Sequence, residues 1–161
     1  MDYVIGCDIG SQSLKTLLLS AEGKICGEFS ASYPIEYPQP TWAEQIPTAW
    51  IDALAKSIRS LLIQNDVSAK QIVALGLDAQ VDGVVALDRK GQPVYPAMIW
   101  MDRRAVEQCD RVGEQISREI VLEITGLNLD PTHVAPKISW LANHRPDLFE
   151  KIGRASCRER V

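Results

Sequence analysis

Residues that could bind a phosphate and its metal ion gather near the start of the chain, in the segment Cys7-Asp8-Ile9-Gly10-Ser11-Gln12-Ser13-Leu14-Lys15. Asp8 ends an apolar run and Gly10 permits a tight reversal, so the pattern predicts a β-hairpin with a carboxylate at the root of its turn. Such a turn offers backbone N–H groups, serine hydroxyls and the Lys15 ammonium to a phosphate, and Asp8 to Mg²⁺. Taken alone, these residues favour the alternative, which is an ordinary glycine turn with a solvated aspartate.

Two further polar segments could contact a small polar substrate. The segment Asp78-Ala79-Gln80-Val81-Asp82-Gly83 lies between apolar runs, which leaves its polar side chains at a loop where they could hydrogen-bond a polyol. The segment Trp100-Met101-Asp102-Arg103-Arg104 opens a predicted helix, for which Asp102 is a suitable N-cap. The alternatives are a polar hairpin loop for the first segment, and a core tryptophan with a capping aspartate for the second. We interpret Arg103 and Arg104 as part of a solvated helix face.

The elements that must position these segments follow an α/β order. The hairpin and a third strand over 24–33 form an antiparallel meander, with the phosphate turn at a sheet edge. Apolar residues from 46 to 62 recur at helical spacing and predict a core-facing helix, and the apolar run over 71–77 predicts a strand covered on both faces. A strand over 84–87 and helices over 102–115, 117–125 and 135–143 follow. This order is typical of a ribonuclease-H-like α/β domain.

The first segment fits the pattern D-x-G-[ST]-x-S-x-[KR], which resembles the first phosphate motif of the actin/hexokinase/Hsp70 superfamily. Within that superfamily the chain resembles the FGGY carbohydrate kinases, xylulokinase-like members most closely, from Tyr3 to about Glu150. Gln80 and Gly83 match the sugar-contacting G-Q-M-H-G segment, whereas Val81 and Asp82 depart from it. Further similar segments are Trp42-Ala43-Glu44-Gln45 (W-x-E-Q), Trp100 to Arg104 (W-x-D-x-R) and Ala135 to Leu141 (A-P-K-x-x-W-L). Ile46 replaces the aspartate that usually follows W-x-E-Q, so the next helix lacks its cap.

The resemblance implies a mixed sheet with helices in a truncated, actin-like ATPase domain, with ATP and Mg²⁺ as cofactors. It implies that Asp8 organises the metal. The residues that it implies for the ATP phosphates are Gly10, Ser11, Gln12, Ser13 and Lys15, and those for the sugar are Gln80, Val81, Asp82, Trp100 and Asp102. A carboxylate at position 82 resembles the acidic member of the glycerol kinase Arg-Glu pair, which leaves xylulose specificity open. His133 would lie near the mouth of the same pocket.

The implied activity is transfer of the ATP γ-phosphate to a hydroxyl of a ketose or polyol. In this family the catalytic aspartate and the adenosine contacts lie well beyond the end of this chain, in a C-terminal domain. We therefore expect the fragment to be inactive, because phosphoryl transfer needs an aligned and closed cleft. The alternatives are another FGGY kinase, acting on glycerol, ribulose or a related polyol, and a non-catalytic sugar-binding module. The resemblance leaves a homodimer of the full-length enzyme open.

Charge and cysteine usage argue against several other classes of protein. The net charge is −4 with acidic and basic residues interspersed, which argues against nucleic acid as a partner. No apolar run approaches the roughly 20 residues that span a bilayer, and no leader is recognisable, so we expect a cytoplasmic protein without a membrane partner. Cys7, Cys26, Cys109 and Cys157 are widely spaced, a pattern that indicates neither a zinc site nor a disulfide framework.

The stretch from Ile152 to Val161 has no hydrophobic periodicity. Back-translated as ATC GGA AGA GCG TCG TGT AGG GAA AGA GTG, it resembles a common sequencing-library adapter read in frame. We therefore expect residues 1–151 to be an incomplete N-terminal kinase domain, and residues 152–161 to be an artefact without packed structure. The alternative is a genuine basic C-terminus.

Overall fold

The computed structural model describes residues 1–156. Within it the chain divides into two compact units, which we describe separately. The sheet unit comprises Met1–Ile35 and Ile46–Gln80, and the helical unit comprises Glu36–Gln45 and the chain from Val81 onward. Each unit packs around hydrophobic clusters of its own.

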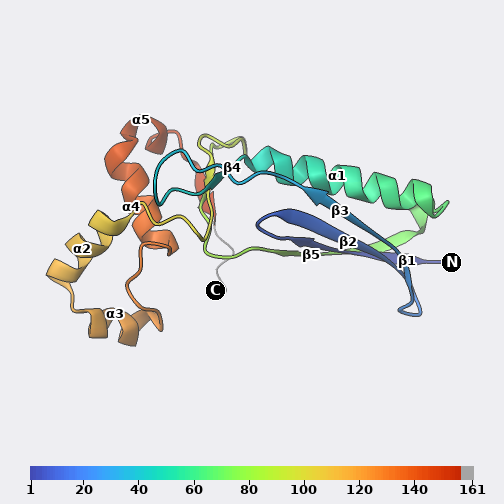
Figure 1. Ribbon diagram of the computed structural model, residues 1–161, viewed down its shortest axis with the longest axis horizontal. Coiled ribbons are helices and arrows are strands. Elements are labelled where there is room, and N and C mark those ends of the chain that lie inside the picture. The colour runs from blue at the N-terminus through green and yellow to red at the C-terminus, as the bar shows by residue number, and fades with distance from the viewer. Residues whose placement is uncertain (157–161) are drawn as a thin grey trace. The chain divides into compact units, whose positions relative to one another are not determined.

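The sheet unit is built on a four-stranded mixed sheet, as predicted (Figure 1). Strands β1 (Tyr3–Ile9), β2 (Ser13–Ser20) and β3 (Ile25–Ser32) form the antiparallel meander, and β5 (Ile72–Ala79) pairs parallel to β1. The strand order is β3-β2-β1-β5. The predicted edge position of the phosphate turn is therefore wrong, because β5 adds beyond β1 and makes the hairpin the inner pair of the sheet.

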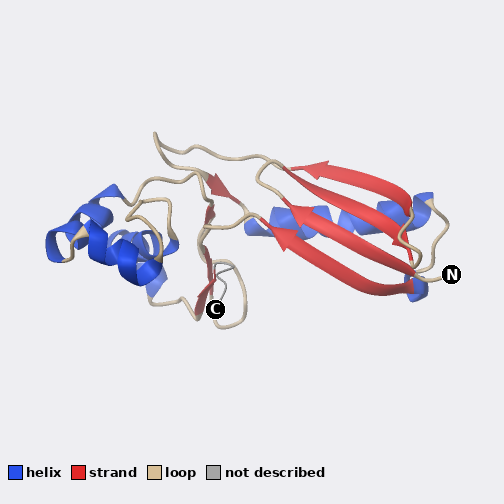
Figure 2. Cartoon of the chain, turned by 90° about the horizontal axis from the view of Figure 1, so that it is seen from below, coloured by secondary structure: helices blue, strands red, loops and turns tan. Residues whose placement is uncertain are grey.

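Helix α1 (Pro47–Gln64) covers one face of the meander, as Figure 2 shows from below. Its first residues lack a side-chain cap, since Ile46 occupies the cap position and Pro47 takes a place where no intrahelical N–H bond is needed. The helix packs Leu61 onto Ile5 and Leu18 of the sheet. A buried hydrogen bond of 2.8 Å joins the hydroxyls of Thr16 and Ser57. The predicted core-facing helix is confirmed.

Strand β5 follows a short 3-10 helix, η1 (Ala69–Gln71), and differs from the prediction of a strand covered on both faces. Val73, Leu75 and Leu77 are 63%, 47% and 52% exposed. Ala74 and Gly76, on the other face, are exposed as well. Among the described residues, β5 pairs only with β1, so an apolar strand lies open at the edge of the sheet.

The helical unit combines short strands with four helices. The strand β4 (Glu44–Gln45) pairs with β7 (Ala97–Met98). The described helices are α2 (Val106–Gln115), α3 (Arg118–Thr125), α4 (Val134–His144) and α5 (Pro146–Phe149). The predicted limits of α3 are confirmed in detail, because the Ser117 hydroxyl accepts a hydrogen bond from the Ile120 N–H and Gly126 ends the helix with a φ of 72°.

The segment after residue 151 is packed in the structure, so the expectation of an unpacked tail is wrong for residues 152–156. Strand β8 (Arg154–Ser156) pairs antiparallel with β6 (Val85–Leu87). The Gly153 N–H donates to the Leu87 carbonyl at 2.9 Å, and Ile152 packs against the cluster around Trp140. Strand pairing uses backbone N–H and C=O groups, which do not depend on the side chain. A segment without hydrophobic periodicity can therefore pair with an open strand edge. Residues 157–161 lie outside the described part.

In the described chain, Cys7, Cys26 and Cys109 are free thiols, and Cys157 lies outside it. None of the described helices is long and apolar enough to cross a membrane.

Candidate functional site

The predicted phosphate turn lies at the end of the inner hairpin of the sheet unit. Asp8 pairs in register with Lys15 on β2, and both side chains are exposed. Gly10, Ser11 and Gln12 form the turn, which the Gly10 N–H closes by donating to the Ser13 carbonyl at 3.0 Å. A Cβ at Gly10 would stand 3.1 Å from that oxygen, so glycine fits the close approach of the two backbone segments.

Tyr33 holds this turn from the side and was not identified from the sequence. Its hydroxyl donates to the Gly10 carbonyl at 2.5 Å, and its N–H donates to the Gln12 carbonyl at 3.2 Å. The side chain is buried, and burial together with the negative charge of Asp8 raises the pKa of Tyr33 to about 12. Tyr33 therefore remains a neutral hydrogen-bond donor at physiological pH.

A row of charges crosses the sheet beside the turn. Asp8 lies in register with Lys15 on one side and with Asp78 of β5 on the other. Because β1 and β5 are parallel, the two carboxylates come from the same ends of neighbouring strands. Asp8, Lys15 and Glu28 also line a hollow of about 720 Å³.

The residue types in this row are those that could hold a magnesium ion together with a nucleotide phosphate. Mg²⁺ keeps several waters and is held by one or two carboxylates together with substrate phosphates. Asp8 and Asp78 would supply two carboxylates to such an ion, and Lys15 would supply a positive charge for a phosphate. The described residues contain no group of three or more protein ligands that would hold a metal by themselves.

In the helical unit, Asp82 stands in a strained turn beside a cavity. Its φ is 57°, a left-handed conformation that costs an ordinary L-residue about 1–2 kcal/mol, although aspartate and asparagine tolerate it better than most. The side chain is 44% exposed, with Oδ1 lying 3.9 Å from Nδ1 of His133. Both residues line a cavity of about 320 Å³, together with Asp130 and apolar side chains from α3 and α4. His133 was predicted near such a pocket.

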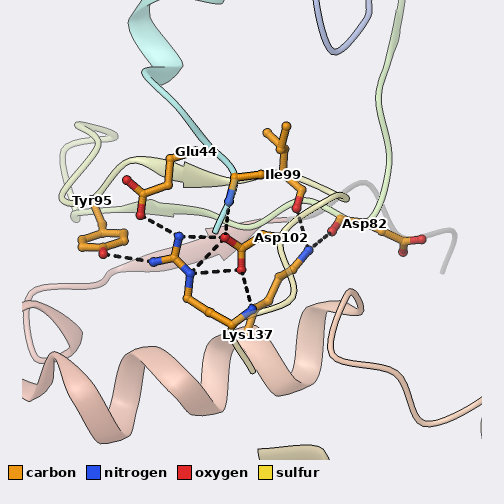
Figure 3. Close-up of polar contacts among 8 residues, drawn as sticks. Glu44, Asp82, Tyr95, Ile99, Asp102 and Lys137 are labelled. Carbon is orange, nitrogen blue, oxygen red and sulfur yellow. Dashed lines mark hydrogen bonds and ion pairs between the residues drawn. The ribbon is translucent and has the colours of Figure 1, made fainter. Parts of the chain in front are cut away.

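Asp102 is fully buried and does not cap a helix, so its predicted capping role is wrong. Helix α2 begins only at Val106, after Ala105. The carboxylate of Asp102 instead accepts hydrogen bonds from the Ala43 N–H at 2.8 Å and from Arg104 Nη2 at 2.7 Å (Figure 3). These bonds and full burial turn Asp102 away from solvent and toward the interior of the helical unit.

Arg104 was predicted on a solvated helix face, and this prediction is wrong as well. Its side chain is fully buried, and its Nη2 lies 2.6 Å from Glu44 Oε1 while Nη1 donates to the Tyr95 hydroxyl at 3.1 Å. The guanidinium stacks 3.7 Å from the centre of the Trp42 ring. Burial works against its charge, but the bonds to Asp102 and Glu44 outweigh burial and raise the pKa of Arg104. The W-x-E-Q and W-x-D-x-R segments are therefore joined by one arginine.

The remaining predicted residues divide between the two units. The Gln80 N–H donates to the Ile9 carbonyl at 2.9 Å and so extends the pairing of β5 with β1 in the sheet unit. Val81 and Trp100 belong to the helical unit and are 53% and 46% exposed. In the sheet unit, Gln80 thus lies next to the strand that leads into the phosphate turn. In the helical unit, Val81 and Trp100 come from two segments that the backbone bonds between Val84 and Met98 join.

Comparisons with known proteins show the family and the fold to which the chain belongs. The sequence model for the N-terminal domain of the FGGY family of carbohydrate kinases matches residues 3–158. The chain belongs to the FGGY family of carbohydrate kinases. Its fold is that of solved members, including xylulose kinase from Rhodospirillum rubrum (TM-score 0.88, 24% identity) and Plasmodium falciparum glycerol kinase with ADP (TM-score 0.85, 22% identity). The match covers 96% and 99% of this FGGY chain, and 32% of each solved chain.

Curated FGGY relatives carry two different substrate names. Xylulose kinase of Bacillus subtilis is 34% identical over 151 residues, a match that covers 94% of this chain and 30% of that protein. Glycerol kinase of a Janthinobacterium species is 35% identical over 154 residues, covering 94% of this chain and 31% of that protein. The chain thus spans about a third of the length of the relatives it matches.

Proposed function

We propose that this chain is the N-terminal part of an ATP-dependent kinase that phosphorylates a hydroxyl of a ketose or polyol. The observation that carries the proposal is the inner hairpin, where Asp8 lies in register with Lys15 beside a tight glycine turn and a hollow. In this proposal Asp8 organises Mg²⁺. The residues that bind the ATP phosphates are Gly10, Ser11, Gln12, Ser13 and Lys15.

The sugar is bound by the segments that begin at Gln80 and Trp100. Gln80 and Asp82 offer hydrogen bonds to hydroxyl groups, Val81 contributes apolar contact, and the exposed Trp100 ring packs against carbon. Asp102 supports these sugar-binding segments without touching the sugar, because its buried carboxylate bonds the Ala43 N–H and the Arg104 side chain. Its contribution is the shape of the loop between Trp100 and α2.

The fragment alone should not catalyse phosphoryl transfer. ATP binding, metal binding and sugar binding lower the barrier only when the three are aligned, and alignment supplies most of the catalysis in this reaction class. The relatives are about three times as long as this chain, so the catalytic base and the adenosine contacts are assigned to the remaining length.

The test is to express the complete gene and to measure sugar-dependent ADP production with xylulose, ribulose and glycerol. We expect one ketose or polyol to be phosphorylated, and the 161-residue chain to match an Asp8→Ala control. Sugar-dependent turnover by the short chain would refute the fragment proposal. Absence of turnover by the complete protein on the whole panel, with ATP and Mg²⁺ present, would refute the kinase proposal.

Glycerol kinase activity is the second candidate. It is favoured by the carboxylate at position 82 and by the identity to the Janthinobacterium enzyme, which equals that to the xylulose kinase within one per cent. Relative kcat/KM for xylulose and glycerol decides between the two.

A further inference from the structure

Helix α4 carries a lysine where an apolar residue would be expected. Lys137 lies three residues after Val134 and four before Leu141, in the stripe that faces the core of the helical unit. It is fully buried. Burying an ammonium costs far more than burying a leucine or methionine, unless hydrogen bonds satisfy it.

The Lys137 ammonium donates hydrogen bonds to backbone carbonyls of two loops. Nζ donates to the carbonyl of Asp82 and to the carbonyl of Ile99, each at 2.8 Å (Figure 3). The two loops are already bridged next to these points, because Val84 and Met98 exchange backbone hydrogen bonds of 2.8 and 3.1 Å. Lys137 therefore joins the loops at the point where they leave their shared ladder.

Both bonded carbonyls belong to, or adjoin, a candidate sugar contact. Asp82 is itself a candidate sugar contact, and Lys137 holds its left-handed backbone by bonding the Asp82 carbonyl. Ile99 directly precedes Trp100, which is 46% exposed. A displacement of either loop would move a sugar-binding group with no loss of the group itself.

We propose that Lys137 is a positioning residue, which clamps the Asp82 and Ile99 carbonyls and so sets the distance between the Asp82 carboxylate and the Trp100 ring. This inference rests on the proposed function for its effect on sugar binding, but not for the clamp. The ammonium acts through the backbone and does not touch the substrate.

Native-state hydrogen exchange tests the clamp in the complete polypeptide. In Lys137→Met, which keeps the apolar stem, the amides of Val84 and Met98 should exchange faster while the Ala43 amide, bonded to Asp102, stays unchanged. Leu141→Ala, a buried truncation on the same helix, is the matched control for general loosening and should raise exchange throughout the helical unit. The same uniform pattern in Lys137→Met would overturn the proposal. So would faster exchange at Ala43 alone, which would make Lys137 a counter-charge for the buried carboxylates.

Kinetics test the consequence. Lys137→Met should raise KM for the sugar by about 10- to 100-fold, the scale expected for a displacement of about 1 Å, while KM for ATP stays within about twofold. Lys137→Gln keeps amide donors and should raise KM for the sugar by less. If Lys137→Met does not fold, hydrogen exchange and kinetics are both measured on Lys137→Gln instead. An unchanged sugar KM would overturn the positioning role. A complete protein without kinase activity would refute the proposed function and leave the exchange result to decide the clamp.

Discussion

Arg104 Nη2 lies 2.7 Å from Asp102 Oδ2, and both side chains are fully buried. Glu44 shares the same guanidinium at 2.6 Å, so one arginine neutralises carboxylates from two distant segments of the sequence. Such a cluster fixes the geometry of the helical unit, because a buried charge without its partner is strongly unfavourable.

Arg104→Met should therefore lower the free energy of unfolding by about 3–5 kcal/mol, since it leaves two buried carboxylates without a counter-charge. Chemical denaturation followed by tryptophan fluorescence measures this, with Trp42 and Trp140 next to the guanidinium. Arg103→Met is the matched control. Its side chain is 51% exposed and pairs with Asp130 at the surface, so its loss should cost less than about 1 kcal/mol. Equal losses for the two variants would show that the buried cluster has no special role.

Tyr33→Phe should lower the stability of the phosphate turn by about 1 kcal/mol, because it removes the hydrogen bond to the Gly10 carbonyl. It should raise KM for ATP and leave KM for the sugar unchanged. Tyr37→Phe is the control, since Tyr37 is 65% exposed. Identical ATP kinetics for the two variants would contradict a role of Tyr33 at the turn.

Tyr33 also predicts a loss of stability at high pH. Burial and Asp8 raise its pKa from 10.0 to about 12, so the folded state keeps a proton that the unfolded state releases. The stability contributed in this way is fully present below about pH 10 and is lost as the pH rises toward 12. Tyr33→Phe should flatten the fall in the free energy of unfolding over that interval, whereas Tyr37→Phe should not. A slope unchanged by Tyr33→Phe would show that Tyr33 ionises alike in both states.

How far the sequence predicts this structure depends on how local each interaction is. The hairpin around Gly10 and the limits of α3 follow from neighbouring residues, and the sequence is sufficient for them. The burial of Arg104 depends on Glu44, which is remote in sequence. The residues next to Arg104 therefore predict, wrongly, that its side chain is exposed to solvent. Lys137 could have been recognised, since a lysine within the apolar stripe of a short helix must find acceptors. The exposure of β5 was not predictable, because its apolar sequence indicates a covered strand, whereas none of the described elements covers it.

The open β5 strand predicts opposite effects of one change in two contexts. Leu75→Lys with Leu77→Lys should increase the soluble yield of the 161-residue chain, because both side chains are about half exposed there and an apolar strand edge promotes association. In the complete protein the same double variant should impair folding, since we propose that further chain covers this strand. Ile63→Lys, at a site on α1 that is 80% exposed, is the control for added charge. Normal folding of the complete double variant would show that β5 remains exposed in it.

The segment after residue 151 predicts a result for the gene itself. Sequence from an independent genomic library should encode different residues after Lys151 and a longer protein. The encoded residues should still fill the position of β8, because β6 offers a free backbone edge and the Trp140 cluster offers an apolar site, which Ile152 now occupies. Finding residues 152–161 encoded in an assembled chromosome would refute the adapter origin.

Asp82→Asn is the sharpest test of the sugar site in the complete kinase. Asparagine tolerates the left-handed backbone as well as aspartate does, so the variant removes the charge without the added strain that Asp82→Ala would bring. Loss of a charge-assisted hydrogen bond to a substrate hydroxyl should cost about 1.5–3 kcal/mol, or roughly 10- to 150-fold in kcat/KM for the sugar, with KM for ATP unchanged. Asp8→Ala should instead lower turnover and alter the dependence on Mg²⁺, because its proposed role is at the metal. Asp110→Asn, at an exposed site on α2, controls for the loss of one negative charge. If Asp82→Asn matched this control across a panel of ketoses and polyols, Asp82 would be a loop residue outside the sugar site.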